Sequence, residues 1–132
     1  MTPILTAHLL PTIEARLIEL LRSLRADEWE AQTVVPAWKV RVVAAHLLDT
    51  QLRKLSRVRD RYASGPPPSF KSKEEFVAFI GRLNREGVEM YPRLSPAVLI
   101  AMMEIASRES AEFHQSLDPM AEAAFSVSWV GE

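Results

Sequence analysis

The sequence predicts an all-α fold, a bundle of amphipathic helices. Apolar residues recur every three or four positions along four segments. Capping residues and prolines stand between these segments. The one stretch that alternates apolar and polar residues, 125–130, has no partner strand elsewhere in the sequence. We therefore expect four helices, joined by short connectors, around one core.

The first helix is expected to begin near Leu9. Pro11 falls in its first turn, where the missing N–H costs little. Residues 26–29 form a short helical turn, and 33–37 form a connector because Pro36 disfavours helix at the residue before it. The apolar positions of the first helix are Leu9, Ile13, Leu17, Leu20, Leu21 and Leu24.

The second helix is expected to run from Val40 to Tyr62, because the sequence Ser-Gly-Pro-Pro-Pro-Ser at 64–69 breaks it. On a helical wheel, its apolar residues gather on one side, which predicts the face that packs on the core. These residues are Val40, Ala44, Leu47, Leu48, Leu55, Val58 and Tyr62.

Two further helices follow. Ser72 and Glu75 have the spacing of a capping box, which opens the third helix, and Pro92 ends it. Ser95 followed by Pro96 is typical of the start of the fourth helix, which is expected to continue to about 117. Their expected inner residues are Phe76, Phe79, Ile80, Leu83 and Val88, and then Leu99, Met102, Met103, Ile105 and Ala106.

Size and composition fit one domain. A chain of 132 residues, 48% hydrophobic and 25% charged, can bury a single core. We assign 1–132 to one helical-bundle domain, with 118–132 as an extended tail. A net charge of −1 gives no global field for nucleic acid. Without cysteine, a signal peptide or an apolar run of roughly 20 residues, we expect a cytoplasmic protein with no membrane contact.

The candidate functional residue is His46, which lies on the wheel opposite the apolar side of the second helix. Periodicity alone favours a surface histidine on a solvated face. The alternative is a polar cleft, because Val42 and Val43 are apolar on that side and suggest partial cover. Asp49 follows one turn later and can orient an imidazole, and Arg53 follows two turns later and can hold an anionic substrate group.

The other histidines are weaker candidates. His8 is near the N-terminus, and His114 lies at the end of the fourth helix, where a protonated ring suits the helix dipole. No His-Glu-x-x-His or His-x-x-x-His pair occurs, so no single helix can supply a metal site.

The second helix is also strongly basic. We interpret this as a solvated face balanced by acidic helices elsewhere. A phosphate- or nucleic-acid-binding strip is the alternative, which the lack of interleaved aromatic residues disfavours. The basic residues are Lys39, Arg41, Arg53, Lys54, Arg57, Arg59 and Arg61.

The most characteristic pattern is the turn Thr33…Pro36-Ala37-Trp38 followed by the helical stretch Val-Ala-Ala-His-Leu-Leu-Asp at 43–49. With it, the chain resembles the DinB/YfiT-like superfamily, and more closely proteins with the N-terminal domain of mycothiol-dependent maleylpyruvate isomerase. Further segments that resemble this family are 20–24 with Glu28 and Trp29, 52–56, Arg59 with Asp60, and 125–132.

The resemblance implies a DinB/YfiT-like helical bundle around a divalent metal, zinc first among the candidates. One ligand is a histidine on the second helix, where His46 stands, and the others lie on a last helix. This sequence stops at Glu132, before that helix, so four helices are expected here. We expect a fragment of a longer protein, and a natural short form that has lost the site is the alternative. Ala37 replaces the family's usual glycine. Lys39 replaces a threonine cap, a loss of about 1 kcal/mol.

Two functions follow from these expectations. The first is a metal-dependent enzyme, a thiol-dependent isomerase or transferase that acts on a small molecule and uses mycothiol or a related thiol. In it, His46 binds the metal, Asp49 orients His46, and Arg53 binds the substrate. The second is a non-catalytic module that works by dimerisation or partner binding, because a bundle lacking a helix leaves an apolar groove that a second copy fills as a homodimer. Nucleic-acid binding is a weaker third.

Overall fold

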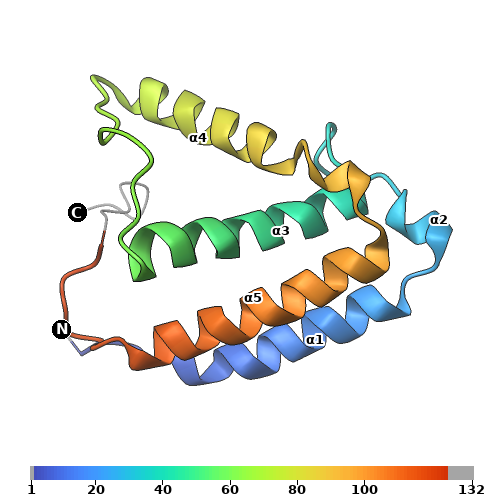
Figure 1. The fold of residues 1–132 in the computed structure, drawn as a ribbon, viewed down its shortest axis with the longest axis horizontal. Helices are drawn as coiled ribbons and strands as arrows, with labels where there is room; N and C mark the ends of the chain where they lie inside the picture. The colour runs from blue at the N-terminus through green and yellow to red at the C-terminus, as the bar shows by residue number, and fades with distance from the viewer. Residues whose placement is uncertain (1, 125–132) are drawn as a thin grey trace.

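The structure, a computed structural model, describes residues 2–124, and within them the protein is entirely helical (Figure 1). The predicted all-α class is therefore confirmed. In this part of the chain, no helix is long and apolar enough to cross a membrane. The elements are η1 (Ala7–Leu9), α1 (Leu10–Ser23), α2 (Ala26–Trp29), α3 (Val40–Lys54), η2 (Leu55–Arg59), α4 (Lys73–Val88), η3 (Tyr91–Arg93) and α5 (Pro96–Ser116).

Helix α5 is the centre of the bundle. It packs along α1 on one side and along α3 on the other, and α4 packs against α3 (Figure 1). Met103 of α5 and Leu48 of α3 are the large side chains that are fully buried. Helix α4 contributes no buried residue. The core consists of Ile18, Leu21, Trp29, Ala44, Ala45, Leu48, Tyr91, Leu99, Ile100, Met103 and Ala106.

The predicted helix starts are confirmed by their caps. The Ser72 hydroxyl accepts a hydrogen bond from the Glu75 N–H at 3.1 Å, and the Ser95 hydroxyl accepts one from the Val98 N–H at 3.2 Å. Lys39 precedes α3 and makes no side-chain capping bond, as expected from the missing threonine. Satisfying the free N–H groups at a helix start stabilises it, so α4 and α5 begin more firmly than α3.

Two predicted helix ends were too late. The α-helical pattern of α3 stops at Lys54 and passes into the π-helical turn η2, and the backbone then reverses at Arg61, which has a φ of 54°. The predicted end at Tyr62 is thus wrong, because a left-handed residue ends the helix first. Likewise, α4 ends at Val88, and Pro92 lies in the separate turn η3.

Several residues expected in the core are exposed. The wheel assigns a broad apolar stripe to each helix, whereas α1 and α5 each bury only the part that meets a neighbouring helix. Ile18 was not among the expected core residues, yet it is buried, whereas Leu20 is exposed. The expected core residues that are exposed are Leu9, Ile13, Leu20, Leu47, Tyr62, Met102 and Ile105.

The C-terminal tail is only partly described. Residues 117–124 contain no helix or strand. The alternating stretch 125–130, expected as an extended tail, lies outside the described residues, as does the remainder of the tail to 132.

Candidate functional site

The connector before α3 is a hydrogen-bonded turn that places Trp38. The Thr33 hydroxyl donates to the Trp38 carbonyl at 2.7 Å, and the Gln32 amide donates to the same oxygen at 3.1 Å. The Trp38 N–H donates to the Val35 carbonyl at 2.9 Å, closing the turn around Pro36. These bonds explain why a threonine and a proline accompany the tryptophan, since together they fix its backbone.

His46 projects from α3 toward that turn. Its imidazole packs against the Trp38 ring, with centroids 4.8 Å apart and planes tilted by 49°. The side chain is half-buried. Its Nδ1 atom is buried and has no hydrogen-bond partner among the described residues. The solvated-face interpretation is therefore wrong, because the indole covers a ring that the wheel alone placed in water.

Burial favours the neutral form of the His46 ring. It lowers the pKa of His46, the positive charge of Arg53 lowers the pKa further, and Asp49 partly opposes both. A neutral imidazole with an unpaired nitrogen can bind a metal ion or accept a proton. A metal ligand needs such a neutral ring with an unpaired nitrogen, and the assignment of His46 as a ligand stays a prediction.

Asp49 and Arg53 form a partly buried pair between α3 and α4. Asp49 is only 9% exposed. The Arg53 Nε atom lies 2.8 Å from Asp49 Oδ2, but its N–H is poorly aligned with that oxygen, so the contact is an ion pair rather than a hydrogen bond. The Arg53 Nη2 group donates to the Asn84 side-chain oxygen at 2.9 Å. The pair thus joins the two helices.

Asp49 does not hydrogen-bond to His46 in the described part of the chain. Its carboxylate contacts Arg53 of its own helix and faces Gly87 of α4. That Asp49 orients the imidazole stays a prediction. That Arg53 binds an anionic group of the substrate also stays a prediction. The structure brings His46, Asp49 and Arg53 onto one side of α3, next to α4.

Gly87 makes this arrangement possible. A Cβ atom added there would lie 2.6 Å from Asp49 Cγ and 2.9 Å from Oδ1, closer than non-bonded atoms approach. Only a glycine lets α4 come this near to the Asp49 carboxylate. Sequence reasoning missed both Gly87 and Asn84. The available signal was a glycine one residue from the end of a strong helical pattern, which often marks close backbone packing.

Tyr91, in η3, lies near Asp49 and Arg53. Burial raises the pKa of its phenol, and the negative charge of Asp49 adds to this effect, while Arg53 opposes it. Tyr91 is therefore a neutral group beside the Asp49–Arg53 pair. It belongs to the core, so its first role is packing.

The described residues do not themselves assemble a metal site. No group of three or more His, Cys, Asp or Glu side chains gathers anywhere in residues 2–124. His114 is engaged elsewhere, with its Nδ1 atom 2.7 Å from the Ser110 carbonyl on α5. A catalytic zinc site normally takes three protein ligands, so this part of the chain offers one donor, His46.

Four of the seven basic residues around α3 and η2 form ion pairs with acidic side chains, which supports a charge-balanced face in part: Lys39, Arg41, Arg53 and Arg59. Lys39 and Arg41 both bind Glu30, at 3.0 and 2.9 Å, and their contacts lower the pKa of Glu30. Arg59 binds Asp60 and Glu109, each at 2.7 Å. Arg41 and Arg59 are therefore engaged within the domain, which leaves them less available for a phosphate group.

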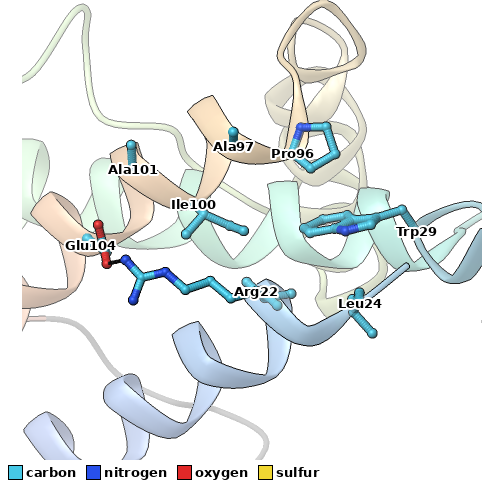
Figure 2. A pocket seen from close by; sticks show the side chains of 9 residues that line it. Arg22, Leu24, Trp29, Pro96, Ala97, Ile100, Ala101 and Glu104 are labelled. Carbon is cyan, nitrogen blue, oxygen red and sulfur yellow. Dashed lines mark hydrogen bonds and ion pairs between the residues drawn. The ribbon is translucent and has the colours of Figure 1, made fainter. Parts of the chain in front are cut away.

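A separate cavity of about 370 Å³ opens between α1, α2 and α5 (Figure 2). Trp29, Pro96 and Ile100 form apolar walls, and an ion pair between Arg22 and Glu104 stands at its edge. The cavity shares no lining residue with the His46 site.

These features define a helical protein of the DinB-like class, with a histidine on its α3 helix held against a tryptophan. The chain belongs to the mycothiol maleylpyruvate isomerase N-terminal domain family, whose model matches residues 10–131. This confirms the resemblance seen in the sequence. No curated protein and no solved structure matches the chain.

Proposed function

We propose that this domain is part of a metal-dependent enzyme that uses a low-molecular-weight thiol, a thiol-dependent isomerase or transferase, and that His46 is one of its metal ligands. The observation that carries the proposal is the His46 ring itself. It is half-buried against Trp38, its Nδ1 atom has no partner within residues 2–124, and burial lowers its pKa. A buried, unpaired polar atom is rare and calls for a ligand or a water molecule.

The family supports the thiol. Its description names mycothiol and an isomerase. A divalent metal, when bound, lowers the pKa of a coordinated thiol and so makes a nucleophile near neutral pH. Because the described residues supply one donor, the remaining ligands must come from elsewhere, and zinc is the first metal to test.

Arg53 is the residue we assign to an anionic group of the substrate. Asp49 and Asn84 hold its guanidinium at Nε and Nη2, which leaves the Nη1 group unengaged within the described chain. A guanidinium fixed in this way binds a carboxylate with little loss of side-chain entropy. Its place two turns from His46 puts a cationic group on the same side of α3 as the imidazole.

The test is metal content. The experiment uses the intact protein with all its metal ligands: the wild type, His46→Ala and His114→Ala are loaded with zinc, dialysed and analysed for bound metal by elemental analysis. We expect His46→Ala to lose the metal that the wild type retains. His114→Ala is the matched control, because its ring is half-buried on α5 and already bonded to a carbonyl.

The outcome decides the assignment. Equal zinc in the wild type and His46→Ala rejects His46 as a ligand. Equal loss in the two variants shows a general structural effect and also counts against the proposal.

A further inference from the structure

The N-terminal half of α5 is apolar on nearly every side. From Pro96 to Ala106 it contains a single charged residue, Glu104. One side is buried in the core, whereas Val98, Met102 and Ile105 on the other side are 47%, 41% and 47% exposed. A helix that is apolar on every side is normally covered on every side. Within residues 2–124, no element covers this outer side.

The exposed residues have the spacing of a helix-packing seam. Val98, Ala101, Met102 and Ile105, hereafter the α5 outer face, stand at positions i, i+3, i+4 and i+7. This spacing places them in one row along the helix. Ala101, in the middle, is small enough for another helix to approach closely. The row fits a second helix laid along α5.

The α5 outer face continues into the cavity beside it. Ala97 and Ala101 belong to the α5 residues that line the cavity, and Trp29 of α2 lines it near Pro96 (Figure 2). A side chain from a covering helix can therefore insert between α5 and α2. Such a hollow next to an apolar row is a common feature of protein–protein contacts.

Charge at the two ends of the row indicates which partner covers it. Arg93 precedes α5 and Glu112 lies near its end, nine and ten residues from Met102. Both are exposed, and neither forms an ion pair within the described part of the chain. Arg93 lies in η3, just before α5, so a second α5 helix running antiparallel and centred on Met102 places the start of each helix, with Arg93 before it, beside the end of the other helix that carries Glu112. A parallel arrangement would bring like charges together.

We propose that the α5 outer face is a homodimer interface, formed by two antiparallel α5 helices around a two-fold axis at Met102. In such a two-fold symmetric contact every interaction occurs twice, once for each copy. The same short segment therefore supplies both charge pairs and both apolar rows. The interface is independent of the His46 site, which lies on the side of α3 that faces α4.

Sedimentation velocity of the 132-residue chain between about 1 and 100 μM tests the proposal. We expect a dimer in the wild type and a dissociation constant raised at least tenfold, roughly, in Val98→Glu, since two charges become buried per dimer. Val77→Glu is the matched control: this valine is 57% exposed on α4, and its substitution should leave the dimer unchanged. Thermal unfolding checks that both variants stay folded.

Charge reversal tests the antiparallel order without altering the apolar row. Arg93→Glu should weaken the dimer, and Arg93→Glu combined with Glu112→Arg should restore it. A wild-type chain that is monomeric at the highest concentration overturns the proposal and leaves the face to another protein. A dimer that is equally stable in Val98→Glu and Val77→Glu, or a double reversal without recovery, overturns it as well.

Discussion

Replacing Gly87 with alanine tests how closely α4 must approach α3. The added Cβ would lie 2.6 Å from Asp49 Cγ and 2.9 Å from Oδ1. Either α4 moves outward by about 1 Å, or the carboxylate turns away and gives up its contact with Arg53. Both changes weaken the contact of α4 with Asp49 and Arg53 of α3, so we expect the substitution to destabilise the fold.

Two opposing contributions set the change in the free energy of unfolding. Overpacking a close contact costs about 1–3 kcal/mol. Alanine in place of a helical glycine returns up to about 1 kcal/mol. We therefore expect Gly87→Ala to lower the free energy of unfolding by about 1–2 kcal/mol.

Gly81 on the same helix is the matched control. A Cβ there meets only the Arg85 Nη1 atom at 3.5 Å, an ordinary contact. Gly81→Ala should therefore stabilise the protein by about 0.5–1 kcal/mol. Urea unfolding followed by circular dichroism measures both variants, and the expected separation is roughly 2 kcal/mol. If Gly87→Ala stabilises the chain as much as Gly81→Ala does, the reasoning about close approach is refuted.

A double-mutant cycle identifies the colliding group. Asp49→Ala removes the carboxylate, so Gly87→Ala made in that background should no longer be destabilising. The coupling free energy between the two sites is expected to be about 1–2 kcal/mol. If the effects of the two substitutions on the free energy of unfolding are additive, the added Cβ at position 87 collides with a group other than Asp49.

Two further predictions concern the same region. Because burial lowers the pKa of His46 in the folded chain, the unfolded chain takes up the proton first as pH falls, so stability should drop from about pH 7 downward through the ordinary histidine value near about 6.5. Urea midpoints at several pH values should show a shallower loss for His46→Gln than for the wild type, and parallel curves would contradict this. Lys39→Thr should stabilise α3 by roughly 0.5–1 kcal/mol, since a helix cap gains about 1 kcal/mol and the exposed contact with Glu30 contributes less. An unchanged thermal midpoint in Lys39→Thr would show that the hydroxyl does not reach the helix N–H groups.

The helix starts could be predicted from sequence because they depend on neighbouring residues. Ser72 and Ser95 cap helices through atoms three positions away, so the local pattern contains all the information. The family resemblance was equally local, since the turn at Thr33 and Trp38 is closed by its own hydrogen bonds.

Exposure and long-range approach could not be predicted in this way. Met102 and Met103 are adjacent and chemically identical, yet one is exposed and the other fully buried, because only the arrangement of α1 and α3 decides which side of α5 is covered. The cover of His46 likewise depends on how the turn folds back over α3, and the Gly87–Asp49 contact joins two helices far apart in sequence. A helical wheel describes one helix and has no information about its neighbours.

The loose attachment of α4 has a consequence for motion. None of its residues is fully buried, only Val88 at its end packs against the core, and its polar contact with α3 runs through Asn84, Arg53 and Asp49. Opening it requires breaking few contacts, whereas separating α5 from its neighbours means unfolding the whole protein. The side of α3 that carries the imidazole can thus be uncovered by a local excursion while the remainder of the bundle stays intact.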